Sequence, residues 1–145
     1  MKIDKLQING FGNIENKEID LSDKINIVYG KNEAGKSTLL KFIVDILYGI
    51  SKNKRHKEFS DYDRYKPWNK EEFSGKISYK LDNGKKYEIY RDFNKKNPKV
   101  YDEESNDISK EFTIDKNLRK SIFYWTNKNR WKYFFINTCS YTTGG

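Results

Sequence analysis

One eight-residue segment, rich in glycine and lysine, constrains this chain more than any other feature. Residues 30–37 read Gly-Lys-Asn-Glu-Ala-Gly-Lys-Ser, which matches the pattern G-x-x-x-x-G-K-[ST] of a phosphate-binding loop. Gly30 and Gly35 allow the backbone to curl, so that successive N–H groups line a concave nest for anionic oxygens. A chain of ordinary composition and this length would match the pattern by chance well under about one time in a hundred. The segment therefore predicts a site for the phosphates of a nucleotide.

Each position of the segment has an expected role. Lys36 brings a point charge to the β- and γ-phosphates, and the Ser37 hydroxyl is a ligand for Mg²⁺. The helix that begins here directs the positive end of its dipole at the same phosphates. The expected cofactors are thus ATP and Mg²⁺. The expected nucleotide-binding residues are Gly30, Lys31, Asn32, Glu33, Ala34, Gly35, Lys36, Ser37 and Thr38.

The residues on either side of the loop fit this interpretation. The apolar, β-branched run 25–29 predicts a short buried strand that leads directly into Gly30. Apolar residues then surround a predicted helix on most sides, and only a narrow polar stripe recurs every four residues. Gly49 is placed to end that helix. The polar stripe consists of Ser37, Lys41 and Asp45.

The remaining patterns predict strands. Leu6 and Ile8 alternate with polar residues before a turn at 10–13, and Ile19 and Leu21 alternate on a second strand. A hairpin is predicted around the turn signal Asp-Asn-Gly at 82–84. These elements predict an α/β fold of the P-loop NTPase class with an additional antiparallel β-hairpin.

Arg91 continues the apolar face of the second hairpin strand, where a charge is unexpected. Two interpretations are open, contact with a phosphate or pairing with a carboxylate, and we favour the carboxylate. Residues 102–110 are acidic and polar and predict a loop, and 112–115 predict one more short strand.

The charge balance favours an acidic partner. The chain has 145 residues and a formal net charge of +8, which fits one domain and favours nucleic acid as a partner. A lysine- and asparagine-rich composition from an AT-rich genome explains the same charge. Residues 51–70 interleave basic and aromatic side chains, which suits contact with a nucleic-acid backbone and base stacking. The alternative for this segment is a solvated loop of an ATPase.

Several function classes are excluded by what the chain contains. The single cysteine, Cys139, allows no internal disulfide, and His56 is the only histidine. The N-terminus has no apolar signal-peptide core, and no apolar run approaches membrane-spanning length. We therefore expect a cytoplasmic protein with no membrane partner.

The composition changes abruptly near residue 121. Residues 122–145 contain eight aromatic side chains and no Asp or Glu, and they show neither a helical nor a strand period. We accordingly divide the chain into a lobe at 1–121 and an aberrant aromatic tail at 122–145. One explanation is a one-nucleotide frameshift from about residue 123. Because Trp is encoded only by TGG, reading one nucleotide later converts both Trp125 and Trp131 into Gly codons. The alternative is a genuine aromatic tail that packs on the sheet.

The wording of the first 50 residues resembles the N-terminal half of ATPase heads in the SMC/RecF/RecN group, and most closely the YhaN-like DNA-repair ATPases. The resemblance rests on the run Gly-Phe-Gly-Asn-Ile at 10–14, on 25–30, and on Asn-Glu-Ala-Gly-Lys-Ser-Thr-Leu-Leu at 32–40. Weaker likenesses are Arg-Tyr-Lys-Pro-Trp at 64–68, 73–75 and 87–91. The resemblance extends over about residues 1–120.

This resemblance implies an ABC-type head whose two halves are separated in sequence by a long coiled coil. ATP would lie between two such heads, Asn32 would sit near the γ-phosphate, and hydrolysis would be coupled to work on DNA. The family also needs a Q-loop glutamine, a signature motif and an Asp-Glu pair, and none is recognisable here. The implied function is that of an ATP-binding N-terminal fragment of an ATPase in double-strand break repair or chromosome maintenance, inactive by itself. Its expected partners are DNA, the C-terminal half of the head and a second head in a homodimer.

Three other functions remain open. A complete small P-loop enzyme, such as a nucleotide kinase, would need an arginine-bearing lid and a further strand-terminal Asp. A transporter-type ABC subunit would lack the same motifs, but the Phe-Gly-Asn-Ile pattern at 11–14 favours the DNA-repair side. A non-catalytic nucleic-acid-binding module would use residues 51–70 and leave the loop vestigial, which the intact Lys36 and Ser37 argue against.

Overall fold

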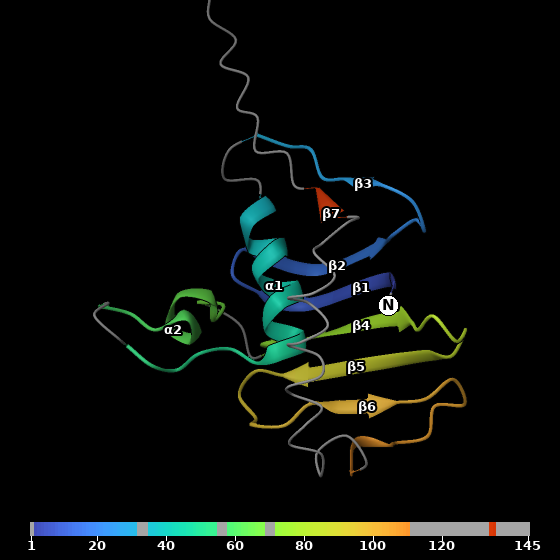
Figure 1. The fold of residues 1–145 in the computed structure, drawn as a ribbon. Coiled ribbons are helices and arrows are strands. Elements are labelled where there is room, and N and C mark those ends of the chain that lie inside the picture. The colour runs from blue at the N-terminus through green and yellow to red at the C-terminus, as the bar shows by residue number, and fades with distance from the viewer. Residues whose placement is uncertain (1, 32–34, 55–57, 69–71, 111–133, 136–145) are drawn as a thin grey trace, which may run out of the picture.

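A five-stranded antiparallel sheet with a long helix across one face forms the body of the protein (Figure 1). The computed structural model describes residues 2–31, 35–54, 58–68, 72–110 and 134–135. The sheet order is β2-β1-β4-β5-β6, and a separate two-stranded sheet pairs β3 with β7. The strands are β1 (Lys2–Phe11), β2 (Ile14–Asp20), β3 (Asn26–Ile27), β4 (Ser74–Lys80), β5 (Lys86–Asp92), β6 (Lys99–Tyr101) and β7 (Phe134–Phe135). The helices are α1 (Lys36–Tyr48) and α2 (Asp61–Tyr65).

Strand β1 lies between β2 and β4 and carries the period-2 pattern of a half-buried strand. Leu6 and Ile8 are fully buried on the α1 side, and Leu6 lies opposite Ile19 of β2 and Ile77 of β4. The expected turn at 10–13 is corrected, because β1 runs through Phe11 and only residues 12 and 13 form the turn. The strand can continue here since Gly10 has no Cβ, which would lie 2.2 Å from the carbonyl oxygen of Glu72.

Strands β4 and β5 form a hairpin around residues 82–84. Gly84 has a φ of 85°, a left-handed conformation that glycine adopts without strain. The register places Ile77 opposite Ile89 and Tyr79 opposite Tyr87, and the two tyrosine rings stack with centroids 5.7 Å apart.

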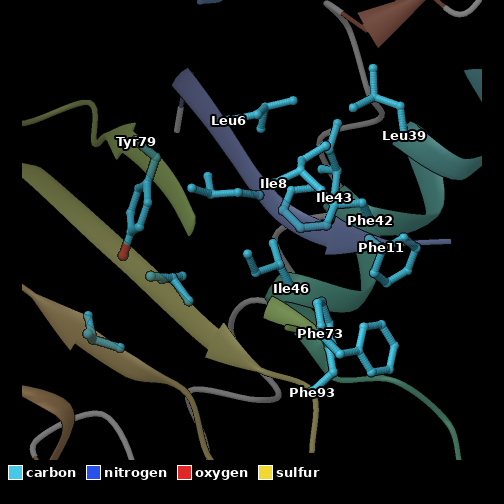
Figure 2. Packing of buried hydrophobic residues seen from close by; sticks show 13 residues of the cluster. Leu6, Ile8, Phe11, Leu39, Phe42, Ile43, Ile46, Phe73, Tyr79 and Phe93 are labelled. Carbon is cyan, nitrogen blue, oxygen red and sulfur yellow. The ribbon is translucent and has the colours of Figure 1, made fainter. Parts of the chain in front are cut away.

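The core lies between α1 and the sheet, and its largest fully buried side chains are phenylalanines (Figure 2). Phe11 packs against Phe42 and Phe93 with ring centroids 5.5 Å and 5.1 Å apart. Gly75 of β4 admits the ring of Phe42, because a Cβ there would lie 2.4 Å from its Cε2 atom. Helix α1, which begins at the phosphate-binding loop, is therefore anchored to the sheet through Phe42.

The strand that enters the loop differs from the prediction. Run 25–29 was expected as a buried strand, but only Asn26–Ile27 form β3, and they pair in parallel with β7. The side chains of Ile25, Ile27 and Tyr29 are 61%, 71% and 87% exposed. The physical reason is topological, because β3 is not a member of the five-stranded sheet and so has no layer of that sheet beside it.

Some sequence predictions lie outside the described residues. These are the strand at 112–115 and most of the tail at 122–145, of which only β7 is described. His56 and Cys139 also lie outside the described residues. The division of the chain near residue 121 therefore stays a prediction.

Candidate phosphate-binding site

The loop meets α1 at a residue whose backbone conformation requires glycine. Gly35 caps the N-terminus of α1 with a φ of 86°, and its carbonyl oxygen accepts the N–H of Leu39 at 2.8 Å. Gly35 is also buried, and because it has no side chain the loop passes directly into α1. The first N–H groups of a helix have no partner within the helix. In α1 these groups, and the positive end of the helix dipole, therefore lie at the loop.

The amino group of Lys36 lies over the beginning of the loop. Its Nζ donates hydrogen bonds to the carbonyl oxygens of Gly30 and Lys31, the latter at 2.7 Å. Ser37 is exposed, so that its hydroxyl is accessible to a metal ion or water, and Thr38 is half-buried. The structure thus brings together Gly30, Lys31, Gly35, Lys36, Ser37 and Thr38. Asn32, Glu33 and Ala34 lie outside the described residues.

The turn between β1 and β2 forms a wall of this site, which sequence reasoning used only as a turn. Gly12 has a φ of 57°, and a Cβ there would lie 2.8 Å from Cγ2 of Thr38. A Cβ on Gly35 would lie 3.4 Å from both Asn13 Oδ1 and Ile14 Cγ1. The Gly-Asn pair at 12–13 was the available signal, because such pairs favour left-handed turn positions that permit close approach.

An ion network of one buried and two half-buried side chains links α1 to α2. Lys41 Nζ lies 2.6 Å from Asp45 Oδ1 and 3.0 Å from Asp61 Oδ2, which links α1 to α2. Asp45 was expected on a polar stripe, yet it is only 1% exposed. The expectation of a polar stripe is wrong at this position, where Asp61 of α2 and Arg91 of β5 lie within electrostatic range of Asp45. The Lys–Asp spacing of four residues was the signal for the pair.

Burial dominates the electrostatics of this network. Burial raises the pKa of Asp45 to about 6, and it outweighs the hydrogen bond that Lys41 donates to this carboxylate. For Lys41, burial lowers the pKa, but the hydrogen bonds to Asp45 and Asp61 outweigh it, so the pKa lies above its usual value. Asp45 Oδ2 has no hydrogen-bond partner among the described residues.

Asp45 is expected to make stability fall as pH rises. Its pKa is about 6 in the folded protein against 3.8 as the ordinary value, so the folded state holds the proton more tightly between these values. Its contribution is present below pH 4 and is lost through pH 6, a change on the order of 3 kcal/mol. Asp45→Asn should therefore gain stability relative to wild type between pH 5 and pH 7.5, measured by urea unfolding. An unchanged difference between the two proteins at both pH values would contradict the pKa assignment, and exposed Asp82→Asn serves as the control.

Arg91 binds the C-terminal part of α1 through its guanidinium group. Its side chain is 6% exposed, and its Nε donates a hydrogen bond to the carbonyl oxygen of Ile46 at 2.9 Å. A cation at the C-terminal end of a helix complements the helix dipole. Its charge also lowers the pKa of Asp45, though less than burial raises it. The favoured carboxylate pairing stays a prediction, and the electrostatic effect of Arg91 on Asp45 is consistent with it.

The aromatic rings of the basic segment 51–70 are of two kinds, half-buried and exposed. Tyr65 stacks on Phe11 with ring centroids 5.2 Å apart, and Tyr62 packs 5.5 Å from Phe73. Phe59 and Trp68 are instead 62% and 94% exposed. Two of the four aromatic side chains expected to stack on bases therefore pack against the core, because α2 places Tyr65 on Phe11 and Tyr62 on Phe73. The remaining two are free to contact a partner.

The described residues contain neither an evident metal-ligand cluster nor a helix that could span a membrane. No group of three or more His, Cys, Asp or Glu side chains that could hold a metal ion occurs within them. No helix in the same part of the chain has the length and apolar character needed to cross a membrane.

Comparison with known proteins places this geometry in a family context. A family model described as an AAA domain matches residues 5–138. The uncharacterized protein YhaN of Bacillus subtilis (strain 168) is 37% identical over 57 residues, which cover 39% of this chain and 6% of YhaN. The DNA replication and repair protein RecF of Oceanobacillus iheyensis is 32% identical over 65 residues, which cover 44% of this chain and 18% of RecF. The matched region is thus a small part of either relative.

Proposed function

The chain belongs to the AAA domain family, and from this premise we propose that it is the ATP-binding lobe of an ATPase of the SMC and RecF class. The observation that carries the proposal is the junction of Gly35, Lys36 and α1. It combines a left-handed glycine, a lysine amino group held over the loop and an exposed Ser37 at a helix N-terminus. These residues fit ATP, and Ser37 fits Mg²⁺, which would neutralise phosphate charge when bound.

The proposed work of the complete protein is on DNA, in break repair or chromosome maintenance in the cytoplasm. Support comes from the likeness to RecF, whose name describes DNA replication and repair. The net charge of +8 adds to this support, because a cationic protein attracts the phosphate backbone.

A completing partner for the head is part of the proposal. Ile25, Ile27 and Tyr29 are each more than half exposed, and they lie in the segment that leads into the loop. A cluster of large exposed apolar side chains around a functional loop marks an interaction surface. We assign this surface to the C-terminal half of the head, and the nucleotide face to a second head in a homodimer.

The tail from about residue 123 is proposed to be the product of a frameshift. The support is its acid-free composition and the Gly codons produced by the shifted reading of Trp125 and Trp131. The family match ends at residue 138 and so includes part of this tail. Sequencing the locus decides the matter, because a tail retained as written in close relatives would end the frameshift proposal.

The chain is expected to bind Mg²⁺-ATP without steady turnover. The loop supplies phosphate contacts, but neither an Asp-Glu pair to position water nor a signature motif is recognisable in the sequence. Isothermal titration should show binding of ATP and far weaker binding of adenosine, and a phosphate-release assay should stay at background. Equal affinity for adenosine would contradict the site. Steady release that Lys36→Ala abolishes would show a complete small enzyme instead.

A further inference from the structure

The sheet carries a second, polar face that the phosphate-binding site does not use. Side chains alternate between the faces of a strand, and the buried set at Leu6, Ile77 and Ile89 packs toward α1. The residues between them therefore point to the opposite face. Figure 1 shows β1, β4, β5 and β6 as neighbours in the sheet. We call the polar set on these strands the tyrosine face, which comprises Gln7, Asn9, Lys76, Glu88, Tyr90, Lys99 and Tyr101.

The strand register aligns four of these residues in one row across the sheet. Gln7 lies opposite Lys76, Lys76 opposite Tyr90, and Tyr90 opposite Lys99. Because neighbouring strands are about 4.8 Å apart, the two lysines flank the Tyr90 ring at a separation of about 10 Å. Tyr101 lies opposite Glu88 in the adjacent row, so a second aromatic ring stands diagonally from the first.

This face is hollowed. A depression of about 430 Å³ is lined by the tyrosine face together with Ser105. Tyr90 and Tyr101 are half-buried, which leaves part of each ring open to the hollow, and the amides of Gln7 and Asn9 are likewise half-buried. The hollow thus combines ring surface, amide groups and amines, and its volume falls in the range of ligand-binding clefts.

The acidic group within the hollow is already neutralised. Lys76 Nζ donates to one oxygen of Glu88 at 3.0 Å, and the Ser78 hydroxyl donates to the other at 3.1 Å. Lys99 is exposed, and its charge contributes to the lowered pKa of Asp107, after the larger effect of hydrogen bonds from Ser109. Each carboxylate near the row therefore has its own partner, and the net charge of the three ionised groups in the hollow is positive.

We propose that the tyrosine face binds single-stranded nucleic acid, with a base stacked on Tyr90 and a flanking phosphate on Lys99. Aromatic rings on a sheet surface, edged by lysines, stack on unpaired bases and track the backbone. A duplex keeps its bases inside its own stack and cannot reach rings recessed in a hollow. Only the choice of DNA as the natural partner rests on the proposed function, since the surface is independent of the loop.

Fluorescence anisotropy of the full chain with a fluorescein-labelled oligothymidylate tests the proposal. Tyr90→Ala should weaken binding about fivefold or more, whereas Tyr90→Phe should bind like wild type because it keeps the ring. Lys99→Gln should reduce the slope of log affinity against log salt by about 0.7, the value for one phosphate contact on a single strand. Tyr90 lies outside the core, and circular dichroism of each variant checks that the fold is kept.

Two comparisons separate this surface from its competitors. Trp68→Ala removes the exposed ring of the basic segment and should have little effect, and Lys36→Ala should lose ATP while keeping the oligonucleotide. The proposal is overturned if Tyr90→Ala binds like wild type, if Trp68→Ala alone removes binding, or if duplex DNA or polyglutamate competes as well as the single strand. If wild type binds the oligonucleotide but not ATP, the assignment of the loop is contradicted and the proposal for the tyrosine face is unaffected.

Discussion

Replacing Lys36 with alanine is expected to reduce affinity for Mg²⁺-ATP by about 10- to 100-fold. The Lys36 amino group lies over the first two residues of the loop, where it donates to the carbonyl oxygens of Gly30 and Lys31. A bound phosphate would exchange these neutral acceptors for anionic oxygens, and a charge-assisted hydrogen bond is worth about 1.5–3 kcal/mol. Isothermal titration of the variant and wild type with Mg²⁺-ATP measures the difference.

The matched control for this prediction is Lys24→Ala. Lys24 is exposed and lies before the loop, so its removal changes the net charge by the same amount without touching the site. We expect it to bind ATP like wild type. Equal ATP affinity in the Lys36 variant and wild type would refute the assignment of the loop. Equal losses of affinity in both lysine variants would show that Lys36 acts only through general charge attraction.

Replacing Phe42 with alanine is expected to lower the free energy of unfolding by about 3–5 kcal/mol. Phe42 is fully buried, and its ring contacts Phe11 edge-on at 5.5 Å and Phe93 at 6.3 Å. The ring also fills the space left open by Gly75. Its loss leaves a cavity between α1 and the sheet. The expected loss of free energy is a large part of the total stability of an ordinary domain. Urea unfolding followed by far-UV circular dichroism measures the change.

Phe59→Ala provides the comparison for this variant. Phe59 has the same side chain but is 62% exposed, so its removal is expected to change stability by less than about 0.5 kcal/mol. Similar unfolding midpoints for the two alanine variants would show that α1 is not anchored through Phe42. A selective loss at Phe42 is also expected to weaken ATP binding at elevated temperature, because the loop is continuous with the N-terminus of α1.

Much of this structure could be predicted from local sequence patterns. The loop motif placed a helix after Ser37 and a left-handed glycine before it, as seen at Gly35, since these demands come from adjacent residues. The Asp-Asn-Gly signal placed the hairpin turn, since only a residue free of Cβ strain suits the φ of Gly84. The family could also be predicted from the sequence, because its characteristic residues lie in one continuous stretch. The family match over residues 5–138 agrees with this prediction.

Such local patterns could not predict contacts between segments that are distant in the sequence. The sequence shows Tyr65 only as one member of a basic, aromatic run, but the structure packs it against the core because α2 brings it onto Phe11. Asp45 reads as a surface residue, but it is buried beside Lys41 and Asp61. Ile27 reads as a core residue, but it is exposed because β3 stands apart from the large sheet.

The sequence by itself thus determined the glycine-rich loop motif, the helix that begins at it, the hairpin and the family. Only the tertiary structure decided which aromatic rings are buried, which wall faces the loop and which polar residues share the tyrosine face. The physical reason is the range of the interactions. Turn and capping preferences act within a few residues, whereas burial and cross-strand rows depend on strands such as β1 and β4, which pair although about 70 residues separate them in the chain.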